Sequence, residues 1–88
     1  MARAKASIGQ VNYATSIIAG RHKLAADEGA ELGGKDTAAN PYDLLCSALG
    51  ACTVITLRMY AERKNWPVTS VHADVTFRRD GDKQLIDR

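Results

Sequence analysis

An α+β fold, in which an antiparallel sheet packs on one long central helix, is predicted by two features of this sequence of 88 residues. The first is a largely apolar segment, residues 40–64, that begins and ends with helix signals. The second is a set of short segments around it in which apolar and polar residues alternate as they do in strands. A chain of this length with 45% hydrophobic residues makes one small globular unit. We therefore expect a single domain over residues 1–88.

The central helix has a clear start and a clear end. Asn40 can cap the first turn, Pro41 suits a position whose N–H would be unpaired, and Asp43 lies at the positive end of the helix dipole. Its end is signalled by basic residues and then by residues that stop helices: Arg63, Lys64, Asn65, Trp66 and Pro67. Residues 44–57 carry no charge, a run too short for a membrane span but suited to a buried helix.

Apolar residues cover most sides of this helix. On a wheel of about 100° per residue, five of them lie within roughly 60° of Cys52: Leu45, Ala48, Leu49, Ile55 and Met59. Cys46 lies about 120° away, among further small and apolar residues. A helix that is apolar on most sides must be covered on most sides, and one small sheet covers only one of them. We therefore expect a homodimer or a higher homo-oligomer.

Four strands are predicted, over residues 6–18, 22–27, 68–79 and 83–88. Gly20 and Arg21 form the first hairpin turn, with Leu24 facing inward on the returning strand, and residues 80–82 form the second turn. Residues 28–39 form a long glycine-containing loop that leads to the helix cap. Loops of this length are more typical of functional edges than of simple connections.

Composition and cysteine usage exclude several classes of function. Twelve basic and ten acidic residues give a net charge of +2, too weak to indicate nucleic acid or an anionic membrane. The basic residues near the N-terminus are scattered in the sequence: Arg3, Lys5, Arg21 and Lys23. Residues 1–5 lack the apolar run of a signal peptide, so we expect a cytoplasmic protein without a membrane partner.

Cys46 and Cys52 are expected to be free thiols. Six helical residues separate them, so their Cα atoms lie roughly 10 Å apart, beyond the reach of a disulfide or a shared metal ion. We therefore expect no metal and no bound cofactor. A helix cysteine is usually a small buried hydrophobe, and a reactive thiolate needs a cation or oriented donors, which residues 40–57 do not supply. Tyr42, near the cap, could donate its hydroxyl to an oxygen of a substrate or simply pack.

Several motifs follow one another in a characteristic order: Gly20-Arg-His22, Asp27-Glu28, Gly33-Gly34, Asn40-Pro-Tyr-Asp-Leu-Leu45, Ala48-Leu-Gly-Ala-Cys52 and Leu57-Arg-Met-Tyr-Ala-Glu-Arg-Lys64. Together they resemble the OsmC/Ohr family of osmotically inducible and organic hydroperoxide resistance proteins, over residues of about 11 to 88. The resemblance implies an intertwined homodimer with the cysteine helices at its centre. It also implies thiol-dependent reduction of small organic hydroperoxides, with Cys52 as the peroxidatic cysteine and an external dithiol as reductant.

Three departures from the family pattern keep two functions open. The chain ends before the second helix, which carries the resolving cysteine in the family, so it resembles the N-terminal half of the fold, apparently truncated. Tyr42 stands where peroxidase members carry Glu, and Arg3 and Arg21 lack the spacing of their catalytic Arg. The first function is a thiol peroxidase acting at Cys52, with Tyr42 as a candidate partner residue. The alternative is a non-catalytic scaffold or truncated relative that forms a dimer or binds a small apolar ligand.

Overall fold

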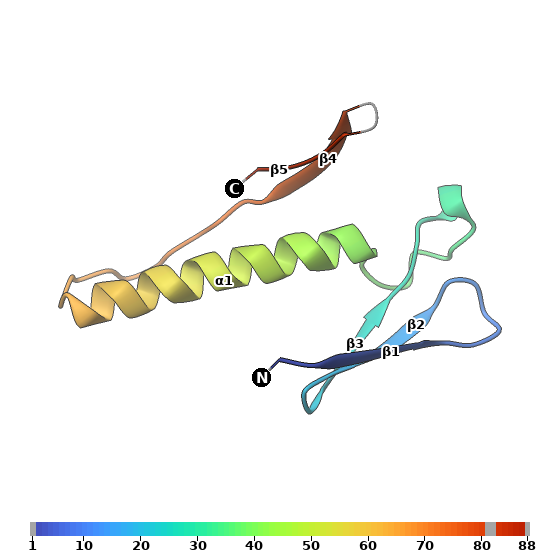
Figure 1. The fold of residues 1–88 in the computed structure, drawn as a ribbon, viewed down its shortest axis with the longest axis horizontal. Coiled ribbons are helices and arrows are strands. Elements are labelled where there is room, and N and C mark those ends of the chain that lie inside the picture. The colour runs from blue at the N-terminus through green and yellow to red at the C-terminus, as the bar shows by residue number, and fades with distance from the viewer. Residues whose placement is uncertain (1, 81–82, 88) are drawn as a thin grey trace. The chain divides into compact units, whose positions relative to one another are not determined.

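The computed structural model describes residues 2–80 and 83–87 and confirms the α+β class (Figure 1). The elements are five strands, a 3-10 turn and one helix: β1 (Ala4–Ile8), β2 (Thr15–Ala19), β3 (His22–Ala26), η1 (Ala30–Leu32), α1 (Pro41–Arg63), β4 (Thr76–Asp80) and β5 (Lys83–Asp87). The chain divides into two units, Met1–Leu44 and Leu45–Arg88. The single domain expected over residues 1–88 stays a prediction.

The N-terminal unit contains a three-stranded antiparallel sheet in the order β1-β2-β3. The prediction of one strand over residues 6–18 is wrong, because the chain turns back between Ile8 and Thr15, which pair with each other. Gly9 and Asn12 lie in this connection, and both residue types are favoured in turns. The alternation of apolar residues continued through the turn and concealed it.

The hairpin between β2 and β3 is confirmed. Ala19 pairs with His22, so Gly20 and Arg21 form a two-residue turn, and Gly20 has a φ of 62°, in the left-handed region that glycine adopts without strain. Leu24 pairs with Ile17 but is 49% exposed, so its predicted inward position is wrong for this chain. The side chains of both residues extend from the same face of the sheet, and this face is not covered at Leu24.

The opposite face of the sheet gathers basic residues that are far apart in the sequence. Ile18 pairs with Lys5 on one side and with Lys23 on the other, so the three side chains share a face. Arg3 and Lys5 line, with Ile18 and Gly20, an open cavity of about 210 Å³. The strand register therefore brings together charges that the sequence alone leaves scattered.

The start and the end of α1 are confirmed. The backbone N–H of Asp43 donates to Oδ1 of Asn40 at 2.7 Å, which is the predicted cap. At the other end, Asn65 has a φ of 59° and the N–H of Trp66 donates to the carbonyl of Ala61 at 2.9 Å. This is a Schellman-type ending with Asn in the left-handed position. The Trp66 ring meets the Tyr60 ring edge-on at 5.4 Å, the apolar contact that accompanies such endings.

Apolar residues are spread almost evenly around α1, as the wheel predicts. The helix has 23 residues and, by length and composition alone, is long and apolar enough to cross a membrane. The core helix of a soluble protein meets the same criterion, so this property assigns no location. A helix with apolar residues on most of its sides needs cover on most of them.

The C-terminal hairpin is shorter than predicted. β4 begins at Thr76. In its pairing with β5, Thr76 lies opposite Asp87 and Asp80 lies opposite Lys83. The strand predicted over residues 68–79 is therefore wrong for residues 68–75. A strand needs a partner to satisfy its backbone groups, and the five residues of β5 reach only as far as Thr76. The predicted turn at residues 80–82 falls largely on residues 81 and 82, which lie outside the described residues, as does Arg88.

Among the described residues, the buried hydrophobic ones are two alanines, Ala26 and Ala61. Large apolar side chains in both units are exposed instead: Leu32 is 65% exposed, Met59 59% and Ile8 57%. When exposed apolar side chains form a large patch, the patch marks a site of association or binding. The described chain therefore has far more apolar surface than it buries.

Candidate functional site

The first candidate site is the thiol of Cys52, at the middle of α1. Cys52 is exposed in the described chain, whereas Cys46 is partly buried. Ile55, one turn further along α1, is 52% exposed. Leu45 and Met59, roughly two turns to either side, are 41% and 59% exposed. The thiol thus lies in an accessible apolar strip of the helix, a surface suited to apolar molecules.

The Cys52 thiol takes part in none of the hydrogen bonds found among residues 2–80 and 83–87. Arg58 is the next cation along α1, but it is six residues away and about 120° round the helix. Its guanidinium donates to the carbonyl of Thr69 at 3.2 Å. The described chain therefore offers Cys52 accessibility and apolar surroundings, and a thiol is activated as a nucleophile only where a cation or oriented donors lie beside it.

Tyr42 lies in the first turn of α1 and is 45% exposed. Ten helical residues separate it from Cys52, which corresponds to about 15 Å along the axis. Within one chain, the Tyr42 hydroxyl therefore does not reach the Cys52 thiol. Cys46 and Cys52 are likewise separated by about 9 Å of helical rise, and both are free thiols.

The second candidate site surrounds a residue that the sequence did not single out for a role. Asp27 directly follows β3 and is 2% exposed, the most buried polar side chain among the described residues. Its Oδ1 accepts the N–H of Glu28 at 2.7 Å. Its Oδ2 accepts the Thr37 hydroxyl at 2.7 Å, the Thr37 N–H at 3.1 Å and, more weakly, the Lys35 N–H at 3.4 Å. One carboxylate thus ties together residues 27–39, which we call the Asp27 loop.

These hydrogen bonds lower the pKa of Asp27 from 3.8 to about 2. The hydroxyl of Thr37 contributes most, followed by the N–H groups of Thr37 and Glu28, and burial acts in the opposite direction. A carboxylate that accepts several donors is favoured in its charged form, which outweighs the cost of removing it from water. Asp27 is therefore a structural anion, held by donors and not by a cation.

The path of the Asp27 loop also requires glycine at one position. A Cβ on Gly34 would overlap the carbonyl of Glu28 and lie 2.8 Å from Oδ1 of Asp27. Gly33 has a φ of 95° and lies against the ring of Tyr13, so that an added Cβ would be 3.4 Å from Cε2. The loop is closed at its ends by the N–H of Asp27, which donates to the carbonyl of Ala39 at 3.1 Å. The loop therefore folds back closely on the end of β3.

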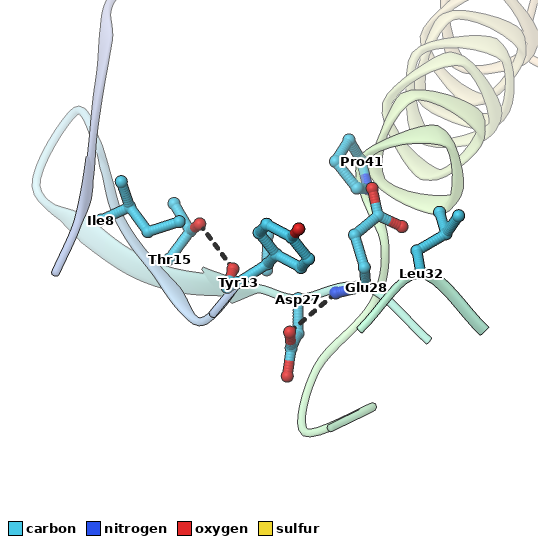
Figure 2. A pocket seen from close by; sticks show the side chains of 8 residues that line it. Ile8, Tyr13, Thr15, Asp27, Glu28, Leu32 and Pro41 are labelled. Atoms are coloured by element: carbon cyan, nitrogen blue, oxygen red, sulfur yellow. Dashed lines mark hydrogen bonds between the residues drawn. The ribbon is translucent and has the colours of Figure 1, made fainter. Parts of the chain in front are cut away.

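Beside the Asp27 loop is an open cavity of about 410 Å³, which we call the Tyr13 cavity. It is lined by residues of the N-terminal unit: Ile8, Tyr13, Thr15, Ala26, Asp27, Glu28, Leu32 and Pro41. Figure 2 shows the Tyr13 ring and the Glu28 carboxylate on one side of the backbone, with the Asp27 carboxylate pointing to the other. The cavity thus has apolar walls, one aromatic ring and, on the same side as that ring, the carboxylate of Glu28.

Sequence reasoning missed both the role of Asp27 and the Tyr13 cavity. It predicted the long loop, and it used Asp27-Glu28 and Gly33-Gly34 only as motifs of the family resemblance. The available signal was the combination of a lone Asp after a strand, a Gly-Gly pair and a Thr ten residues later, all in one loop of unusual length. Among the described residues, no group of three His, Cys, Asp or Glu side chains comes together as metal ligands would.

Comparison with protein families gives one match. A family model described as "OsmC-like protein" matches residues 33–88, well over half of the chain. The match includes all of α1 with Cys52 and begins inside the Asp27 loop. Searches among curated proteins and among solved structures give no match.

Replacing Gly34 by Ala should destabilise the fold by about 1–3 kcal/mol, because the new Cβ would overlap the Glu28 carbonyl and force the loop to move. Gly29→Ala is the matched control in the same loop, since a Cβ there meets nothing within 4 Å and its φ is −71°. Urea denaturation of the two variants measures the difference. Equal midpoints for both would mean that the loop does not take this path.

Stability should depend on Asp27 in a defined pH range. Since its pKa is lowered from 3.8 to about 2 in the folded chain, its stabilising effect is complete above pH 3.8 and is lost as the pH falls through about 2. The stability difference between wild type and Asp27→Asn should therefore be largest near neutral pH and shrink steadily below pH 4. Denaturation midpoints across this range test it, with the exposed Asp74→Asn as control. A difference that does not change with pH would contradict the network.

Proposed function

Because the chain belongs to the OsmC-like family, we propose that it reduces small organic hydroperoxides through the thiol of Cys52. The observation that supports this most is the exposed position of Cys52 at the middle of α1, within the segment that the family model matches. A nucleophile must be reachable by its substrate, and the Cys52 thiol is reachable in the described chain.

The reaction proposed for Cys52 is a two-electron oxidation of sulfur. The thiolate attacks one peroxide oxygen, the O–O bond breaks, and the other oxygen leaves with a proton as an alcohol. Cys52 becomes a sulfenic acid. An external dithiol then returns the thiol, forming its own disulfide and releasing water. No bound cofactor takes part in this scheme.

The surroundings of Cys52 favour an apolar hydroperoxide over hydrogen peroxide. Leu45, Ile55 and Met59 present exposed apolar side chains on the same side of α1, and burying an alkyl or aryl group against them is favourable in water. Hydrogen peroxide has no such group. The preference for organic substrates would therefore come from the helix face and not from the thiol itself.

Tyr42 is proposed to act between subunits. Its hydroxyl is a hydrogen-bond donor, but it lies about 15 Å along α1 from Cys52 of the same chain. If two copies of α1 pack against each other in an antiparallel arrangement, Tyr42 of one helix can approach the centre of the other. In that arrangement its hydroxyl would donate to a peroxide oxygen at Cys52.

A homodimer or higher homo-oligomer is part of the same proposal. Its support is the large exposed apolar surface, which includes Leu57 and Met59 on α1 at 50% and 59% exposure. Family membership and the low burial of the described chain are both consistent with a dimer. A second copy of α1 is a suitable cover, because it offers the same length of apolar surface.

The alternative is a non-catalytic member of the family that keeps the helix as an assembly element. It is favoured by one observation, namely that no described residue donates a hydrogen bond to the Cys52 thiol. A thiol without donors or a cation is not activated as a nucleophile. The two functions differ in whether Cys52 reacts at all with a limited amount of hydroperoxide.

Sedimentation at micromolar concentration should show a dimer or a larger assembly. The physical reason is that a lone chain would leave most of α1 in contact with water. The folded state is checked by circular dichroism in the same buffer, so that an unfolded monomer is not mistaken for a folded one. A stable, folded monomer across this concentration range would contradict the proposal.

A limited dose of cumene hydroperoxide should oxidise Cys52 to a sulfenic acid, faster than the same dose of hydrogen peroxide does. Mass spectrometry with a sulfenic-acid trap measures the extent and the site. Cys46→Ser is the matched control and should react as wild type does, whereas Cys52→Ser should not react.

The same experiment also measures how many hydroperoxide molecules each chain reduces. The second thiol of the chain is Cys46, about 9 Å away along a rigid helix, and disulfides require Cα atoms within about 7 Å. Without added dithiol, we therefore expect one hydroperoxide consumed as Cys52 becomes a sulfenic acid. That species then either consumes a second hydroperoxide and becomes a sulfinic acid, or forms a disulfide between subunits. An intrachain Cys46–Cys52 disulfide would mean that this segment is not an intact helix. An unmodified Cys52 would favour the non-catalytic function.

A further inference from the structure

The Tyr13 cavity has the composition of a binding site for a small organic cation. We propose that it binds a molecule with an apolar body and one ammonium group, with the ammonium between Glu28 and the Tyr13 ring. The cavity belongs entirely to the N-terminal unit, so this proposal is independent of the chemistry of Cys52. Its volume of about 410 Å³ lies within the range of small-molecule sites.

The charge of the ligand follows from the two acidic residues at the cavity. Asp27 is occupied, because both of its oxygens accept hydrogen bonds from the loop and its carboxylate points away from the Tyr13 ring (Figure 2). Glu28 is half-buried, and no described residue forms an ion pair with it. A partly buried carboxylate facing an apolar cavity attracts a cation and repels an anion.

The aromatic ring strengthens the preference for a cation. The Tyr13 ring lies beside the Asp27 loop, close enough to Gly33 that a Cβ there would be 3.4 Å from it. Figure 2 shows the ring on the same side of the backbone as the Glu28 carboxylate. A cation within about 6 Å of the centre of an aromatic ring is attracted by the ring, and more strongly when water is partly excluded. An ammonium group placed here would interact with both residues at once.

The apolar part of the ligand would contact the remaining walls. Ile8 and Leu32 are 57% and 65% exposed, and Pro41 completes this side of the cavity. Covering these side chains by a ligand removes apolar surface from water. Because the Asp27 loop already holds Glu28 and Gly33 in place through its hydrogen bonds, little ordering is needed when the ligand binds.

The test is titration of the wild-type chain with benzylammonium, followed by NMR of the backbone amides and by calorimetry. We expect a dissociation constant on the order of a millimolar for a probe of this size. The largest shifts should fall on Leu32, Gly33 and Gly34. Benzyl alcohol, which has a similar shape without charge, should bind at least about tenfold more weakly, and benzoate should not bind.

Glu28→Gln keeps the shape and the loop hydrogen bonds, which use the backbone of Glu28. It should weaken benzylammonium binding about tenfold or more. Glu31→Gln is the matched control, an exposed residue of the same loop that does not line the cavity, and should bind within about twofold of wild type. Three results would each overturn the proposal. Glu28→Gln could bind benzylammonium as tightly as wild type does, or wild type could bind benzyl alcohol as tightly as benzylammonium. The third is that wild type binds no benzylammonium because a second copy covers the cavity.

Discussion

The buried carboxylate of Asp27 determines the course of the chain between the sheet and the helix. A buried charge is tolerated only when hydrogen bonds replace the water that it loses, and here the donors come from Glu28, Lys35 and Thr37. These donors are spread over ten residues, so satisfying one side chain fixes the whole Asp27 loop. The loop in turn brings the carbonyl of Ala39 to the N–H of Asp27, just before the cap of α1. The Asp27 carboxylate therefore fixes the loop that borders the cavity and leads to α1.

The second constraint is an excess of apolar surface over the means to bury it. α1 is apolar on most sides, and among the described residues the buried hydrophobic ones are two alanines. The proposed function and the proposed assembly both rest on this excess. A strip that is open enough to admit a hydroperoxide at Cys52 is also open to a second helix. Association of two helices would exclude water around the thiol, which strengthens any hydrogen bond or charge placed beside it.

The sequence predicts those parts of the fold that depend on neighbouring residues. Asn40 caps α1, Asn65 and Trp66 end it, and Gly20 makes the hairpin turn, because each of these signals acts within a few residues. The errors arise where the structure depends on contacts between residues that are far apart in the sequence. Residues 68–75 alternate as a strand does, but a strand also needs a partner of matching length, and β5 supplies only five residues. Asp27 was missed for the same reason, since its main donor, Thr37, is ten residues away.

The two candidate sites are supported by different kinds of argument. The family match covers residues 33–88 and so includes Cys52, whereas the cavity residues up to Leu32 lie before it. Family membership therefore bears on the thiol and is silent on the cavity. For Cys52 the proposed chemistry rests on the family match, and the described structure contributes accessibility and an apolar face. For the Tyr13 cavity the inference rests on composition alone: an apolar wall, an aromatic ring beside Gly33 and a carboxylate without a described cation. Such a site binds by charge and shape, and it can do so whether or not Cys52 reacts.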